Sequence, residues 1–298
     1  TSALLRIDGR PPLPLRLETD VGRHSASFTA DLNAFGPGAW EGVLEVADLA
    51  PTRNAFTMPL RFAIPGLQIA EDQQSVNFSA AGAGFTVRGG RSDTISVDAS
   101  GISAHMTLQP GGQKHLYVRG FESVTDLGTE NGWREVEAKA LLEDIDGKPV
   151  TDEEVGVRLY LNAAVHNDLP AIVVTGTVEN IGAERSMYGF WGWLPGAAYV
   201  TPDGDTHEWT MTYHDFGNPG WVFLPNKSAD RPGVGWISGE TFGESRFGTM
   251  LLYTTERKPA VATGDSLTMT FALMPALAAE EVEEMAERLR EKGVDLAP

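Results

Sequence analysis

Cysteine is absent from the 298-residue chain. Disulfides, zinc–thiolate sites, iron–sulfur clusters and cysteine nucleophiles are therefore excluded. The absence is compatible with the cytosol, the periplasm and secretion alike, so it does not fix the compartment. The chain also lacks a run of about 18 apolar residues, and we therefore expect no transmembrane helix.

Basic residues are scarce. The chain has 23 lysines and arginines against 41 aspartates and glutamates, which gives a formal net charge of −18. Binding to nucleic acid or to an anionic membrane surface requires clustered basic residues. We therefore expect neither nucleic acid nor a membrane as a partner. The charge does not exclude a local arginine clamp for an anionic substrate.

The common catalytic and cofactor signatures are missing as well. The sequence contains no Gly-x-Ser-x-Gly elbow, no Walker loop and no His-Glu-x-x-His zinc motif. Gly82 and Gly84 lack the third glycine of a dinucleotide fingerprint. The acidic run that begins at Asp144 departs from calcium-loop spacing at Lys148. We expect no metal and no cofactor.

The chain opens at Thr1 without an initiator methionine or a signal-peptide pattern. An exported protein with its signal removed would begin in this way, and so would a piece of a longer protein. We expect a secreted or periplasmic location. The sequence is consistent with two kinds of partner, a further domain and a second copy of this chain in a homo-oligomer.

Glycine and proline are abundant, at 33 and 18 residues. This excess over average composition favours many turns and many short strands. Apolar and polar residues alternate in several segments, most regularly between Leu267 and Leu273. We predict an all-β fold, with a small immunoglobulin-like β-sandwich at 1–70 and a larger antiparallel β-domain at 71–275.

The segment 276–298 has a different period. Apolar residues recur at spacings of four, three and four between Ala278 and Leu289, which places them on one helix face. Acidic residues come early and basic residues late, an order that complements the helix dipole. Gly293 is a natural helix stop. We predict one amphipathic C-terminal helix within this segment.

Five of the seven tryptophans lie in the segment 188–253, among many Asp, Asn and His residues. Sugars present an apolar C–H face and a rim of hydroxyls, so their sites need aromatic platforms beside planar polar side chains. This composition favours a carbohydrate surface over a phosphate or nucleotide site. The candidate substrate-binding residues are Trp191, Trp193, Trp209, Tyr213 and Trp221. The alternative is that these rings form the core of a large sandwich.

Candidate acid–base groups lie in the same segment. Glu208 follows His207, and Asp215 follows His214. Groups of these types can move protons to and from a sugar. Because neighbouring strand residues point to opposite faces, the two members of each pair share a site only on a loop. We take His214, His207, Glu208 and Asp215 as the candidate catalytic residues.

Several passages resemble known β-sandwich proteins. The stretches 174–182 and 190–197 resemble galactose-mutarotase-like supersandwich domains. The stretches 218–225 and 233–238 are similar to β-sandwich regions that accompany bacterial polysaccharide-active enzymes, and 13–65 resembles their immunoglobulin-like modules. The resemblance implies a galactose-mutarotase-like β-supersandwich for 71–275, and it carries over no catalytic residue.

Three functions are consistent with these observations. The first is an accessory, carbohydrate-binding region of a carbohydrate-active protein, with the glycan held on an aromatic platform. The second is a complete enzyme, either a glycoside hydrolase, a polysaccharide lyase or a sugar epimerase, that uses His, Tyr and carboxylate groups. The third is a purely structural sandwich whose tryptophans all lie in the core. The acidic charge accounts for solubility in all three, so it does not discriminate.

Overall fold

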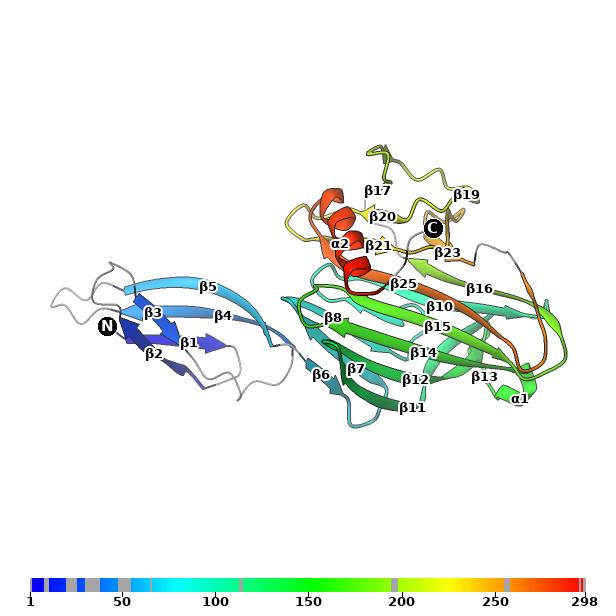
Figure 1. Cartoon of the computed structure of the whole chain (residues 1–298), viewed down its shortest axis with the longest axis horizontal. Coiled ribbons are helices and arrows are strands. Elements are labelled where there is room, and N and C mark those ends of the chain that lie inside the picture. The colour runs from blue at the N-terminus through cyan, green and yellow to red at the C-terminus, as the bar shows by residue number, and fades with distance from the viewer. Residues whose placement is uncertain are drawn as a thin grey trace.

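A computed structural model of the chain describes residues 2–7, 11–19, 26–29, 38–47, 55–64, 66–112, 115–193, 198–254, 258–294 and 296. The predicted all-β class is confirmed, and so is the predicted C-terminal helix. Figure 1 shows a small N-terminal sheet and a larger β structure that carries this helix. Within the described ranges, no helix is long and apolar enough to cross a membrane.

The N-terminal region forms one antiparallel sheet. Its strands are β1 (Ser2–Ile7), β2 (Leu13–Thr19), β3 (Ala26–Thr29), β4 (Gly38–Ala47) and β5 (Ala55–Ile64). They pair in the order β3-β2-β1-β4-β5. Alternation along the strands brings Leu5 and Ile7 against Leu13, Leu15 and Leu60 in a small apolar cluster. Among the described strands there is one layer, and the second layer of an immunoglobulin-like sandwich is not among them.

The rest of the chain builds a large antiparallel sheet with two arms. The first arm runs in the order β6 (Gly66–Ile69), β7 (Ser75–Ala80), β8 (Ala83–Arg88), β9 (Ile95–Val97), β10 (Ile102–Pro110), β16 (Arg185–Trp193), β23 (Met250–Tyr253), β22 (Thr241–Glu244) and β19 (His214–Gly217). Because β6 pairs with β7, the hydrogen-bonded large sheet begins at Gly66.

The second arm runs in the order β11 (Leu116–Glu130), β12 (Trp133–Asp144), β14 (Val157–His166), β15 (Ile172–Asn180), β25 (Ser266–Ala276), β21 (Gly233–Ile237), β20 (Trp221–Leu224), β17 (Tyr199–Val200) and β18 (Thr206–His207). Two short strands flank the arms: β13 (Pro149–Val150) pairs with β12, and β24 (Ala260–Val261) pairs with β16. The arms join where β10 pairs with β11.

The main core fills the space between the two arms. Trp191 of β16 meets Phe271 of β25 edge to face, with ring centroids 4.9 Å apart. Trp236 of β21 contacts Phe271 and also Phe242 of β22, at 5.6 Å in each case. The Trp191–Phe271 and Trp236–Phe242 pairs connect strands of opposite arms, and such aromatic pairs add about 0.5–1.5 kcal/mol beyond the burial of their area. The arms therefore face each other, as the layers of a sandwich do.

The C-terminal helix α2 (Ala279–Glu291) packs on the second arm. The buried residues of its predicted apolar face are Val282, Met285 and Leu289. They join a second apolar cluster that includes Trp221. A Cβ on Gly235 would stand 2.6 Å from Cγ2 of Val282, so glycine at this position lets the helix approach β21. Gly293 has a φ of +84°, the conformation expected of the predicted stop.

The structure adds a second, short helix that the sequence analysis does not predict. This is α1 (Asp152–Val155), and its N-terminus is a capping box. The Glu154 N–H donates to the Thr151 hydroxyl, and the Thr151 N–H donates to the Glu154 carboxylate. The Thr-x-x-Glu spacing is the signal that identifies such a start.

Candidate functional site

A hollow of about 310 Å³ brings together two of the candidate acid–base residues. It forms around β17, β18 and β19 and the turns next to them. The lining residues are Tyr199, Thr201, Pro202, Asp203, His207, His214, Phe216 and Pro219. We call it the histidine hollow, because His207 and His214 reach it from different strands.

Four rings of the histidine hollow form a row. His207 stacks on Tyr199 with centroids 5.0 Å apart and planes 19° apart. Tyr199 stacks on Phe216 at 5.4 Å and 12°. Phe216 in turn lies 6.0 Å from the tilted ring of His214. Tyr199 is buried, His207 and Phe216 are half-buried, and His214 is exposed, so His214 forms the solvent end of the row.

A chain of hydrogen bonds leads from His207 to a carboxylate. Oγ1 of Thr201 donates to Oδ1 of Asp203 at 2.7 Å and lies 2.9 Å from Nε2 of His207. The threonine hydroxyl has one proton and gives it to Asp203, so Nε2 of His207 is the donor to Thr201. This contact fixes the tautomer of a neutral imidazole and leaves Nδ1 as its acceptor.

Two groups of the hollow have shifted pKa values. The Thr201 hydroxyl, followed by the backbone N–H of Asp205, lowers the pKa of Asp203 by donating hydrogen bonds to its carboxylate. Burial, followed by the nearby Glu244 carboxylate, raises the pKa of Tyr199. The hollow therefore offers a carboxylate that persists in mildly acidic solution, next to a phenol that keeps its proton.

Glu244 is a site residue that the sequence analysis misses. It is 1% exposed, and it lies opposite His214 in the β19–β22 ladder. Its Oε1 accepts the backbone N–H of Met211 at 2.7 Å, and its Oε2 accepts the Thr210 hydroxyl at 3.0 Å. Met211 has a φ of +60°, which is uncommon for a residue other than glycine.

Glu244 thus holds the connection that runs from His207 to His214 in a defined conformation. The burial of Glu244 follows from the pairing of β22 with β19, two strands that are distant in the sequence. No local pattern of residues reveals such a contact, so only the folded structure identifies this role.

Trp221 borders a neighbouring hollow of about 230 Å³ and is 7% exposed. The helix α2 supplies the other wall, with the charged residues Glu283, Glu287 and Arg290. This Trp221 hollow shares Pro202 and Pro219 with the histidine hollow. The two hollows therefore adjoin each other on the surface.

The other two acid–base candidates lie apart from the histidines. In the β19–β22 ladder His214 lies opposite Glu244, and Asp215 lies opposite Gly243. The side chains of His214 and Asp215 therefore point to opposite faces, as the alternation argument predicts. Glu208 is exposed and stands outside the residues that line the hollow.

The structure disperses the predicted binding rings. Trp191 is 0% exposed in the core, so it presents no face to a ligand. Trp209 is half-buried, with its ring 5.1 Å from that of Tyr199. Tyr213 is 66% exposed and borders a different hollow. For Trp193 the backbone lies in β16, and its side chain is outside the described residues.

No protein-family model and no curated protein matches the chain, whereas solved structures do. A GH36 α-galactosidase from Geobacillus stearothermophilus matches at 10% identity and a TM-score of 0.47, over 73% of this chain and 42% of that one. A glycosyl hydrolase family 38 protein from Enterococcus faecalis matches at 8% and 0.47, over 97% and 41%. An Escherichia coli K12 protein assigned as an aldose 1-epimerase matches at 10% and 0.38, over 70% and 99%.

These matches concern the fold alone. The chain spans about two fifths of the length of the α-galactosidase chains. All three TM-scores are below 0.5, and we take neither a substrate nor a reaction from these proteins.

Proposed function

We propose that the chain binds a carbohydrate in the histidine hollow. The observation that carries this proposal is the row of four rings beside the Asp203 carboxylate. A sugar can set its C–H face against the exposed ring of His214 at the end of this row and donate its hydroxyl protons to the fixed Asp203 carboxylate. The ring nitrogens of His207 and His214 add further donors and acceptors for hydroxyl groups.

We propose further that the ligand is an oligosaccharide. The Trp221 hollow continues the histidine hollow across Pro202 and Pro219. Their volumes of about 310 and 230 Å³ add up to the size range of ligand sites. The second hollow offers the indole of Trp221 together with carboxylates of α2, so a second sugar unit finds the same kinds of contact there.

Binding without turnover is the favoured role. Hydrolysis of a glycoside in its usual form needs two carboxylates that flank the scissile bond. Asp203 is the one carboxylate among the residues that line the histidine hollow, and Glu283 and Glu287 line the adjoining Trp221 hollow instead, so the histidine hollow itself holds no carboxylate pair. In this proposal the chain is an accessory region of a larger carbohydrate-active protein that works outside the cell or in the periplasm.

A second candidate function is proton transfer on a bound sugar, as in a lyase or an epimerase. The observation that favours it is the presence of two imidazoles in one hollow, one of them held in a defined tautomer by Thr201. Such chemistry needs an acid and a base, and it does not need a carboxylate pair.

A screen on insoluble polysaccharides tests both functions. We expect the intact protein to be retained and to release neither reducing ends nor unsaturated products. His207→Ala and His214→Ala should each weaken retention at least about tenfold. His115→Ala, which removes a histidine outside the hollow, is the matched control and should change nothing.

The other outcomes are equally informative. If the intact protein released products and His207→Ala or His214→Ala abolished that release, the acid–base function would replace simple binding. Retention that both hollow variants leave intact would contradict the site. Soluble oligosaccharides of increasing length then test the continuous groove, since affinity should rise from one sugar unit to at least two.

A further inference from the structure

A separate hollow of about 370 Å³ lies on the outer face of the second arm. Strands β12, β14 and β15 supply its floor, and the end of α2 supplies a wall that includes Lys292. It shares no lining residue with the histidine hollow or the Trp221 hollow. We call it the outer hollow.

Strand register explains the floor of the outer hollow. Glu135, Ala164 and Val173 lie side by side on the three strands. The residues next to them in sequence, Val136 and Val174 among others, are buried in the main core. Alternation therefore directs this row away from the core, and its two small apolar members form a flat, apolar floor.

The rim of the outer hollow is polar. Asn162 donates from Nδ2 to Oε1 of Glu135 at 2.5 Å, which orients both side chains. The amide oxygen of Asn162 and the second carboxylate oxygen of Glu135 take no part in this bond and are acceptors. Thr175 is held in the same way by a hydroxyl contact of 3.0 Å with Thr270.

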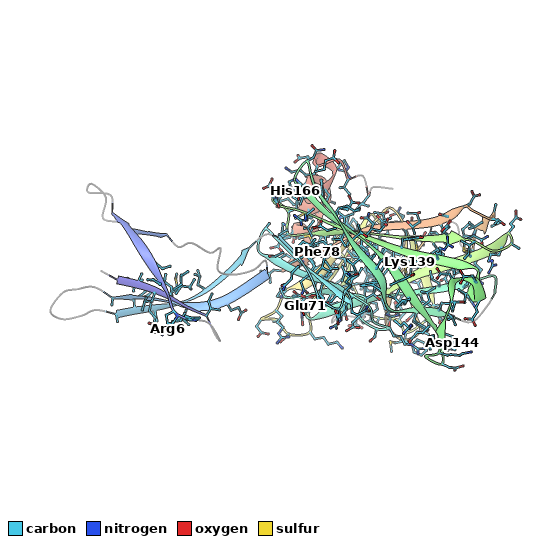
Figure 2. All side chains as sticks on the ribbon, turned by 90° about the horizontal axis from the view of Figure 1, so that it is seen from below. Arg6, Glu71, Phe78, Lys139, Asp144 and His166 are labelled. Carbon is cyan, nitrogen blue, oxygen red and sulfur yellow. The ribbon has the colours of Figure 1, made fainter. Side chains whose placement is uncertain are left out.

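Trp133 forms an aromatic side of the outer hollow. Its half-buried indole meets the ring of His166 edge to face at 5.2 Å. His166 is 4% exposed, and Figure 2 shows it beside α2. Gly132 has a φ of +85°, and a Cβ there would stand 2.6 Å from Nε2 of His166. A glycine turn and a buried imidazole therefore fix the position of the indole.

We infer that the outer hollow binds a neutral sugar unit of a glycan. The indole and the floor of Ala164 and Val173 match the C–H face of a sugar ring, and the oriented acceptors of the rim match its hydroxyls. The wall residue Lys292 lies 3.3 Å from the Asp168 carboxylate, which balances its charge. Glu130 and Glu135 at the rim then disfavour a carboxylated sugar.

Tryptophan-selective NMR tests this site directly. The protein is labelled with ¹⁵N at its seven tryptophans and titrated with neutral cello-, xylo- and manno-oligosaccharides. The indole signal of Trp133, identified with Trp133→Phe, should shift and saturate with at least one of them. Oligogalacturonate, the acidic probe, should leave that signal in place.

Two variants test whether the sugar binds in the outer hollow or only at the surface around it. Ala164→Leu fills the floor without removing a polar contact, and it should weaken binding at least about tenfold. Thr268→Leu adds the same side chain to the same face of the sheet outside the hollow, and it should leave binding unchanged. The other indole signals show whether each variant is folded. Should Ala164→Leu disturb them, Glu135→Gln takes its place and should likewise weaken binding.

Three results would overturn the inference: no shift of the Trp133 signal with any neutral probe, a shift that persists when the floor is filled, or a preference for oligogalacturonate. The test does not depend on the proposed function. A Trp133 shift that survives His207→Ala and His214→Ala supports the outer hollow whatever happens at the histidine hollow, and the polysaccharide screen decides the histidine hollow separately.

Discussion

The core between the arms and the histidine hollow draw their rings from the same segment of the chain, yet they use them differently. Trp191 and Trp236 are 0% exposed and lie on strands of nine and five residues that have neighbours on both sides. Tyr199, His207 and Phe216 sit on strands of two to four residues near the end of the sheet.

This difference follows from the length of the strands and from the turns beside them, since Tyr199 of the hollow also lies on a strand with two neighbours. A strand with two neighbours directs every second side chain into the core, whatever the polarity of the surrounding sequence. A short strand beside a turn leaves polar groups of the turn next to its rings, as Thr201 and Asp203 are next to Tyr199. Aromatic composition therefore marks the segment, and the length of each strand and the turn beside it decide which rings can meet a ligand.

The largest expected effect comes from the core. Trp191→Ala should lower the free energy of unfolding by about 3–5 kcal/mol, because it leaves a cavity beside Phe271. Urea unfolding followed by circular dichroism measures this loss. Trp191→Phe is the control and should lose less. If the free energy of unfolding fell by less than about 1 kcal/mol in Trp191→Ala, the distinction between the core rings and the rings of the histidine hollow would be wrong.

The next effect is expected at Glu244, which links the core to the hollow. Glu244→Gln keeps the shape of the side chain but replaces one of the two acceptor oxygens with a donor, so stability should fall by about 1–3 kcal/mol. Affinity for a retained polysaccharide should fall as well, because the connection between the histidines loses its anchor. Glu208→Gln, at an exposed position, should leave both quantities unchanged.

The fold is predictable where residues alternate or repeat with a clear period. The alternation from Leu267 to Leu273 becomes the central strand β25, and the apolar spacing after Ala278 becomes α2. The short helix α1 depends on a capping box of two residues, and a search for apolar periodicity does not detect such a signal.

The site is less predictable because it depends on contacts between distant strands. The pattern selects His207 and His214, which line one hollow, but it does not select Glu244, whose contacts need the β19–β22 pairing. The same pattern groups Trp191 with Trp221, although one lies in the core and the other borders a hollow. Burial is a property of sheet pairing, so local sequence does not determine it.

His105 allows a test of burial on the outer face of the first arm. A Cβ on Gly192 would stand 2.7 Å from Cε1 of His105, so the imidazole lies against the sheet. Burial, followed by the charge of Arg91, lowers the pKa of His105 from its ordinary 6.5. The folded protein therefore keeps His105 neutral at a pH at which the unfolded chain protonates it.

The sign of the pH effect follows from this difference. Below about pH 6.5 the unfolded state binds more protons at His105 than the folded state does. The free energy of unfolding should therefore decrease as the pH is lowered from about 6.5 to the lowered pKa of His105 in the folded protein. Urea unfolding at a series of pH values measures the fall. His105→Gln removes this contribution and should show a shallower dependence, whereas equal slopes in both proteins would refute the assignment.

The smallest effect on stability is expected at the solvent end of the ring row. His214 is exposed, so His214→Ala should change the free energy of unfolding by no more than about 0.5 kcal/mol. The same variant should lose polysaccharide retention, since His214 lines the hollow. A variant that loses affinity but keeps its stability identifies a ring that contacts the ligand. A variant that loses stability in the absence of any ligand identifies a ring that belongs to the core. If His214→Ala destabilised the protein as much as Trp191→Ala, the histidine hollow and the core would form one structural unit. The position of His214 would then support no separate binding role.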